Sequence, residues 1–244
     1  RAAPVMRTRR PVSSGGRCRR IMASIPWSGD GPGGLVDEAA TLVRTAASWA
    51  AWTHRGGPRH PRRGTMPGMA YFERLGPNTF RATEHVSGAW QLDEQHIAPA
   101  LGLLAHLVET DHQARRPDGL VIARLSYDIL GTMPVDVVDT SIQVLRGGRT
   151  IELVEARMSH DGRDAVVLRA WLLDTRDTSA LAGTAFPALP HPDEVPAWPV
   201  HTFWPGGFIA SAEVRRVLKE PGRGQVWVRT DLPLLADEPV SALA

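Results

Sequence analysis

The stretch that decides the fold is residues 89–111, AWQLDEQHIAPALGLLAHLVETD, where four polar side chains lead directly into a nearly continuous apolar run. Apolar residues recur there at the three- and four-residue spacing of one helix face: Ile97, Leu101, Leu104 and Val108, widened by Ala100, Leu103 and Leu107. We therefore predict a helix over about Ala98 to His112. Its polar edge is small and consists of His106, Glu109 and Thr110. Other elements must wrap such a helix, because little of its surface suits water.

The segments around this helix have the period-two alternation of β-strands. Strands are predicted over residues 78–86 before the helix and 120–130, 135–146, 149–159 and 164–174 after it. Gly147-Gly148 and Asp161-Gly162 predict tight two-residue hairpins, because the favoured turn needs positive φ at both central positions. The order strand, helix, four strands predicts an α+β fold in which a curled antiparallel sheet wraps the helix.

Charge divides the chain into unlike parts. Residues 1–65 carry twelve Arg against three acids, a net charge of +9, whereas the remaining residues carry −7. The composition of residues 1–65 predicts a basic, disordered leader, or an upstream extension of the reading frame with Met66 or Met69 as the biological start. The leader has no aromatic interleaving suited to base stacking, so we do not expect it to bind nucleic acid.

Cysteine content and motifs exclude several classes of protein. Cys18 is the only cysteine, so neither an internal disulfide nor a cysteine-based zinc site can form. No apolar run approaches the roughly 18 residues of a membrane span. The sequence also lacks a His pair at metal-binding spacing, a glycine-rich phosphate loop and a Gly-x-Ser-x-Gly elbow. We therefore expect a cytoplasmic protein that needs no metal and no cofactor.

The second half of the chain opens with a proline-rich segment. Residues 176–207 contain six prolines after position 186, which predicts an irregular connector between two domains. Beyond it, residues 208–218 and 224–230 are expected to form two strands, and DEPVSALA at 237–244 has the acid-then-proline start of a helix. Residues 70–175 would then be one domain and residues 208–244 the beginning of a second, whose remainder we expect beyond Ala244 in a longer protein.

Four local features resemble the bacterial acyl-CoA thioesterase II-like family: Gly88-Ala89-Trp90, His96-x-x-Pro99, the run 125–130 followed by Met133-Pro134-Val135, and GRTIELVEA at 148–156. Chains of that family carry two fused hotdog domains, each a curled antiparallel sheet around a central helix. The resemblance covers residues 70–244. It implies hydrolysis of fatty acyl-CoA thioesters by an activated water, without a metal or a covalent intermediate. Because hotdogs pair through their sheets, it also implies a homodimer or a pseudo-dimer.

The resemblance also bears on the candidate site. The family's water-activating acid lies on the second central helix, expected beyond Ala244, so no catalytic residue is assigned. At the first helix the family pattern is His-Gly-Gly-Pro, whereas this chain has Ile97-Ala98 between His96 and Pro99. These larger residues narrow the approach of a thioester to the helix N-terminus, where backbone N–H groups could stabilise an oxyanion. His96 and Gln95 are therefore candidates for substrate binding, with structural packing as the alternative for His96 and an exposed amide as the alternative for Gln95.

The other candidate residues lie in or near the predicted helix and in the strand predicted over 120–130. Trp90 would wall an acyl tunnel or fill the sheet corner, and Tyr127 and Asp128 would bind substrate or, for Asp128, form an edge or dimer contact. Asp93 and Glu94 are interpreted as acids that favour the start of the helix, and His106 as a satisfied or edge histidine. Surface arginines could meet the phosphates of CoA or remain solvated: Arg115, Arg116 and Arg124.

Two rival functions stay open. A noncatalytic acyl-binding or assembly module is favoured by Ile97-Ala98 and by the missing acid. A hydratase of the same fold would add water to an enoyl thioester, but hydratases resemble one another in an Asp, four residues, then His, and only two residues separate Asp93 from His96.

Overall fold

The computed structural model describes residues 69–244, apart from residues 89, 118, 184–187, 222, 237 and 242. The leader, residues 1–65, therefore lies outside the described residues. No helix in the described part of the chain is long and apolar enough to cross a membrane.

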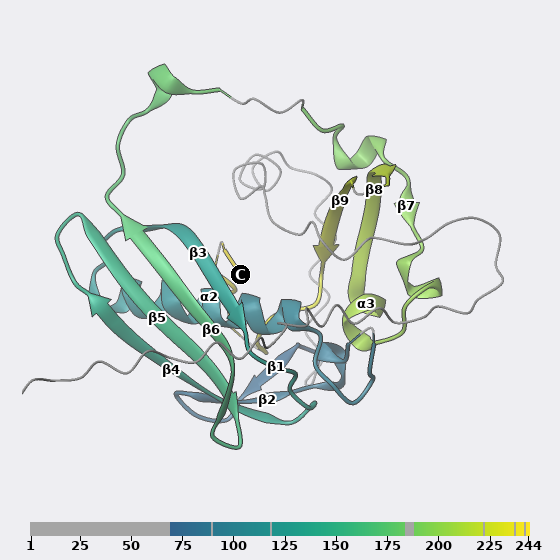
Figure 1. Cartoon of the computed structure of the whole chain (residues 1–244), viewed down its shortest axis with the longest axis horizontal. Helices are drawn as coiled ribbons and strands as arrows, with labels where there is room; N and C mark the ends of the chain where they lie inside the picture. The colour runs from purple at the N-terminus through teal and green to yellow at the C-terminus, as the bar shows by residue number, and fades with distance from the viewer. Residues whose placement is uncertain are drawn as a thin grey trace, which may run out of the picture. The chain divides into compact units, whose positions relative to one another are not determined.

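One antiparallel sheet forms most of the described structure around a single long helix (Figure 1). Its strand order is β1-β2-β4-β5-β6-β3, and the helix is α2, Ile97–Arg115. The strands are β1 Phe72–Arg74, β2 Thr79–Ala82, β3 Val121–Ile129, β4 Val137–Arg146, β5 Ile151–His160 and β6 Arg163–Leu173. The sheet curls along α2 without closing into a barrel, so the predicted α+β hotdog fold is confirmed.

The helix is buried much as its periodicity predicts. The side chains without exposure include Ala100, Leu103, Leu104 and Val108, which pack against inward-facing strand residues such as Val154, Ala156 and Met158. The predicted polar edge is partly wrong, because His106 is only 3% exposed. Its Nδ1 accepts a hydrogen bond from the Ser241 N–H at 3.2 Å, so a distant segment covers this side of the helix.

Successive residues of β5 and β6 face opposite sides of the sheet. Leu168, Ala170 and Leu172 of β6 face α2 in the core. Residues at the alternate positions, such as Leu153 on β5 and its cross-strand partner Trp171 on β6, therefore point to the outer face. The side of the sheet turned away from α2 is its outer face.

One of the two predicted hairpin turns is correct. Asp161 (φ 50°) and Gly162 (φ 73°) join β5 to β6 with positive φ at both positions. The tight turn at Gly147-Gly148 is wrong, since four residues separate β4 from β5 and neither glycine has positive φ. The Arg116 guanidinium donates to the Gly148 carbonyl at 2.7 Å and the Arg149 carbonyl at 3.2 Å, which holds this longer loop open.

The start of the domain differs from prediction in two details. The strand expected over 78–86 stops at Ala82 and is followed by a short 3-10 helix, η1 Glu84–Val86. Thr83 causes this break because its side chain accepts from the His85 N–H and caps the helix. β1 was not predicted, since three residues are too few to show alternation.

A second sheet has the order β7-β8-β9, with β7 Ala197–Trp198, β8 Ala212–Glu220 and β9 Arg223–Thr230. Residues 176–207 are therefore not wholly irregular: they include β7 and three short 3-10 helices, η2 Ser179–Leu181, η3 Pro192–Glu194 and η4 Val200–Thr202. The predicted strand over 208–218 begins late, because the short helix α3 occupies Gly207–Ser211.

The helix expected over 237–244 is wrong for the described residues of that range. The chain before it joins the first sheet instead: the Tyr71 N–H donates to the Pro233 carbonyl at 2.9 Å and the Phe72 N–H to the Leu234 carbonyl at 3.0 Å. Leu234 and Leu235 are buried in the core around α2. Burial of these two leucines and the ion pair between Arg74 and Glu238 (2.6 Å) override the local helix signal.

Candidate functional site

The N-terminus of α2 is capped by His96. The ring Nδ1 of His96 accepts a hydrogen bond from the backbone N–H of Ala98 at 3.2 Å. The backbone N–H of His96 donates to the Val86 carbonyl at 2.6 Å. Because Nδ1 is an acceptor, the proton of the neutral ring lies on Nε2. Burial lowers the pKa of His96, which favours this neutral form. The imidazole can therefore offer one N–H donor, at Nε2.

Few backbone donors remain at this helix end. Ala98 donates to His96, and Pro99 has no N–H. The Ile97 N–H has no acceptor among the described residues. A helix without a capping side chain leaves its first N–H groups free to bind an anion. At the start of α2 the remaining donors are the backbone N–H of Ile97 and the ring N–H of His96.

The segment Gly206-Gly207-Phe208 covers the same helix end. The ring of Phe208 stacks on His96 with centroids 4.2 Å apart and planes inclined by 21°. The Gly207 N–H donates to Ser87 Oγ at 2.6 Å, and the Phe208 N–H donates to the Ser87 carbonyl at 3.3 Å. Gly206 has φ 122°, and a Cβ there would lie 2.5 Å from the Gly88 carbonyl oxygen. Only glycine permits so close an approach in this conformation.

The polar side chains before His96 do not converge on it. Gln95 is buried, its Nε2 donates to the Pro134 carbonyl at 2.8 Å, and its Oε1 has no partner among the described residues. Glu94 accepts from Thr132 Oγ1 at 2.9 Å, and Asp93 is exposed. Hydrogen bonds thus join residues 93–95 to residues 132–135. No carboxylate among the described residues forms a hydrogen bond with His96.

The other three candidates lie apart from one another. The Tyr127 hydroxyl donates to the Leu101 carbonyl at 2.9 Å, and burial raises the pKa of this phenol. Asp128 is exposed on the outer face, opposite Val167. Trp90 is 88% exposed, which does not fit the packing of a sheet corner. Contact of these side chains with an acyl group remains a prediction.

A buried ion cluster at the other end of α2 was not predicted. His112 Nδ1 lies 3.0 Å from Glu152 Oε1, and His112 Nε2 accepts from the Leu120 N–H at 2.9 Å. Nδ1 therefore carries the proton and donates to the carboxylate. Burial opposes ionisation of Glu152, but hydrogen bonds from Arg115 and His112 lower the pKa of this carboxyl. An acid at an inward position of an alternating strand was the signal that could have revealed this cluster.

This cluster also accounts for two of the surface arginines. Arg115 donates to Glu152 at 2.9 Å and to Asp111 at 2.8 Å, and Arg116 holds the loop between β4 and β5. Arg124 is exposed without a carboxylate partner among the described residues. Of the three arginines predicted as partners of the CoA phosphates, Arg124 is therefore the remaining candidate, because Arg115 and Arg116 bond within the protein.

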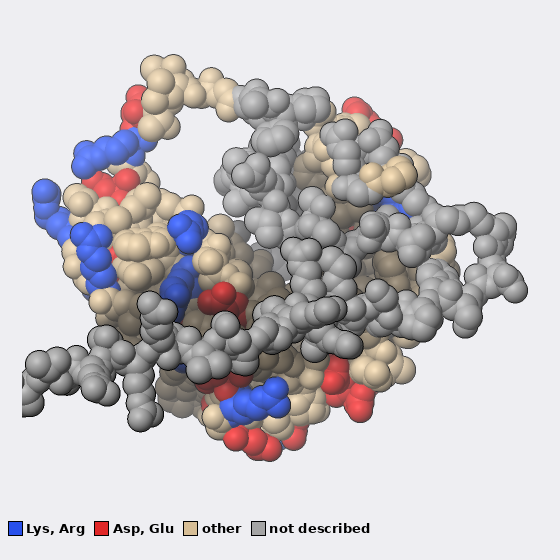
Figure 2. Space-filling view, viewed as in Figure 1, with Lys and Arg blue, Asp and Glu red and all other residues tan. Residues whose placement is uncertain are grey.

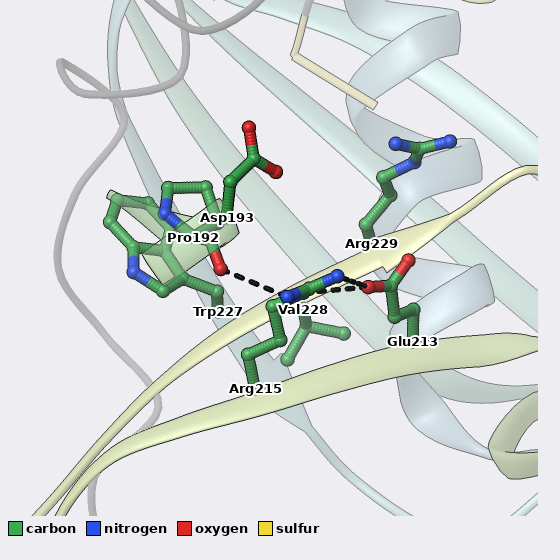
Figure 3. Close-up of a pocket in the computed structure, with 7 residues that line it drawn as sticks. All are labelled: Pro192, Asp193, Glu213, Arg215, Trp227, Val228 and Arg229. Atoms are coloured by element: carbon green, nitrogen blue, oxygen red, sulfur yellow. Dashed lines mark hydrogen bonds and ion pairs between the residues drawn. The ribbon is translucent and has the colours of Figure 1, made fainter. Parts of the chain in front are cut away.

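None of the predicted site residues lines either of two cavities beside the described elements. One cavity of about 60 Å³ lies beside Arg215, whose guanidinium donates to the Pro192 carbonyl and pairs with Glu213 (Figure 3). The same guanidinium also donates to the Val195 carbonyl. The other, of about 260 Å³, is lined mainly by apolar residues beside His112. Both are smaller than the ligand pockets of roughly 300–1,000 Å³ that typically hold small molecules.

The fold and this capped helix define a hotdog protein. Residues 86–173 match the family described as the acyl-CoA thioesterase N-terminal domain. The match spans η1 to β6, so this part of the chain is similar to that family. No curated protein matches the sequence.

Solved structures with similar chains include three hotdog or thioesterase proteins. A hotdog protein of unknown function from Alicyclobacillus acidocaldarius is 14% identical with a TM-score of 0.48 and 67% of this chain covered. An acyl-CoA thioesterase II, TesB2, from Mycobacterium marinum is 19% identical with a TM-score of 0.43 and 69% covered. A TesB protein from Mycobacterium avium subspecies paratuberculosis is 18% identical with a TM-score of 0.43 and 69% covered. This chain spans 61% of the length of each.

Proposed function

We propose that this protein hydrolyses fatty acyl-CoA thioesters through an activated water. The observation that carries the proposal is the match of residues 86–173 to the acyl-CoA thioesterase N-terminal domain. In this reaction, water attacks the thioester carbonyl, negative charge develops on its oxygen, and the C–S bond then breaks to release a carboxylic acid and the thiol of CoA. The neutral imidazole of His96 carries a proton on Nε2 and could donate a hydrogen bond to that oxygen.

Among the described residues, the helix end at His96 lacks a partner that could deprotonate water. Its imidazole has no carboxylate bonded to it in the described chain, and Nδ1 already serves as the cap of α2. A general base must lie within hydrogen-bond reach of the water it activates. We therefore assign His96, Gln95 and Tyr127 to substrate positioning and leave the base unassigned.

A second function is favoured by the covered state of this helix end. Phe208 lies on His96, and His96 and Pro99 remove two of the donors that an oxyanion would need. A noncatalytic acyl-binding module would have no need of those donors. The hydratase alternative gains no support from this arrangement, since Asp93 is exposed and does not contact His96.

The two functions are separated by thiol titration during incubation of the full chain with acyl-CoA of several chain lengths. Thiol release above the uncatalysed rate supports hydrolysis, whereas saturable binding of acyl-CoA without thiol release supports the module. His96→Asn is the informative variant, because Asn is a good helix cap but lacks the imidazole. We expect about a tenfold fall in turnover for His96→Asn. His191→Asn is the matched control, since His191 also caps a helix, η3, but is exposed.

A further inference from the structure

A row of four side chains crosses one end of the outer face. It consists of Arg146 on β4, Leu153 on β5, Trp171 on β6 and Arg124 on β3. Each neighbour in this row is a direct cross-strand partner of the next, so all four side chains stand on the same side of the sheet. We call it the outer row.

Apolar side chains continue the outer row toward the end of the sheet. Ile151 pairs with Leu173, and Leu173 pairs with Val121. Leu173 is 38% exposed and Val121 50% exposed. Together with the half-buried Leu153 and Trp171 they are successive apolar neighbours on the outer face, and contiguous apolar surface is a feature of interaction sites.

The arginines that flank this apolar surface are uncompensated. Arg124, Arg146 and Arg149 are exposed, and none of the described acids pairs with them. The charged side chains further along the strands on the outer face are paired. Glu155 forms ion pairs with Arg157 and Arg169, and Arg157 also pairs with Asp164. The two positive and two negative charges of this group therefore cancel. In Figure 2 blue atoms gather over the end of the sheet at the left of the view. The surface therefore has an apolar floor between positive edges.

These features point to a partner of defined chemistry. Arg124 and Arg146 are separated by three strand spacings, roughly 14 Å, and an α-helix with its side chains is about 10–12 Å across. A helix laid along the strands over Leu153 and Trp171 would thus fit between the two arginines. Carboxylates on both flanks of that helix could form charge-assisted hydrogen bonds with the guanidinium groups. Trp and Arg are also the residues that most often dominate the energy of an interface.

We propose that the outer row docks an acidic amphipathic helix of a partner protein, with its apolar stripe on Leu153 and Trp171 and its carboxylates on Arg124 and Arg146. A second copy of this chain fits less well, because it would bring the same uncompensated arginines to the interface. An anionic membrane also fits less well, because side chains that stand on the face of a sheet have little reach into a lipid layer.

The test uses a labelled 18-residue helical peptide with a leucine stripe and glutamate flanks, and fluorescence anisotropy with the full chain at low ionic strength. We expect saturable binding that weakens as salt rises. Arg124→Glu and Arg146→Glu should each weaken it about tenfold, and Trp171→Ser should do so as well. The matched control is Arg163→Glu, which makes the same charge change at the opposite end of β6, where the described residues offer no carboxylate partner, and should change binding less than twofold.

Several results would overturn the proposal. One is equal binding of a peptide with lysine flanks, and another is equal loss of binding in Arg163→Glu. Binding to phosphatidylglycerol vesicles that depends on Arg124 and Arg146, without peptide binding, would make the surface a membrane site instead. A dimer in sedimentation that Arg124→Glu dissociates would assign the surface to a second copy. Circular dichroism of each variant distinguishes lost binding from lost folding.

Discussion

Replacement of His112 by Ala should destabilise the fold strongly, because His112 joins three separate segments from a buried position. The side chain is only 2% exposed as part of α2, it donates to Glu152 on β5, and it accepts from the Leu120 N–H before β3. Loss of the hydrogen bond to a carboxylate costs about 2 kcal/mol, and the buried Leu120 N–H left without an acceptor costs about 2 kcal/mol more. The expected loss in the free energy of unfolding is therefore about 4 kcal/mol at neutral pH.

Urea denaturation of the full chain, followed by circular dichroism, measures this loss. His112→Gln should be less destabilising than His112→Ala, since an amide can still supply a donor and an acceptor. The control is His191→Ala, an exposed site where we expect a change within about 0.5 kcal/mol. A His112→Ala variant that stays within about 1 kcal/mol of the parent would refute the reasoning, because the two buried hydrogen bonds would then contribute little.

Three further predictions follow from the same contacts. Gly206→Ala should destabilise by about 1–3 kcal/mol in urea denaturation, since φ 122° and the nearby Gly88 carbonyl exclude a Cβ, whereas Gly183→Ala, with open space around it, should be neutral. Burial lowers the pKa of His96, so Phe208→Ala should raise this pKa toward its ordinary value in an NMR titration. An unchanged pKa would show that the Phe208 ring does not shield the imidazole from water. Phe203→Ala is the control, because Phe203 is exposed. The lowered pKa of Glu152 stabilises the fold above the ordinary glutamate pKa, and this contribution is lost as pH falls through the lower folded value. In urea denaturation at a series of pH values, the unfolding free energy should therefore drop below the ordinary glutamate pKa, and less steeply in Glu152→Gln.

The parts of the fold that could be predicted are those fixed by local pattern. The apolar spacing from Ile97 to Val108 identified α2, and Asp161-Gly162 identified a true hairpin because both residues adopt positive φ. Gly147-Gly148 has the same local signal, but its loop is set by Arg116, a side chain more than thirty residues away.

The candidate site was predictable only in part for the same reason. His96 was expected beside the start of α2, but its position as the cap was not predicted, because the predicted helix began at Ala98 rather than at Ile97. The Phe208 ring that covers it comes from a segment 112 residues later, and nothing in the local sequence shows that contact. Similarly, the acid and proline at 237–239 favour a helix locally, whereas burial of Leu234 and Leu235 beside β1 decides the conformation nearby.

The central claim, action on acyl-CoA thioesters, is tested most directly by the release of CoA thiol from a long-chain acyl-CoA in the presence of the full chain. The proposal predicts saturable release above the uncatalysed rate, competed by a thioether analogue that binds in the same place but cannot be hydrolysed. Absence of both thiol release and binding of the analogue would contradict it.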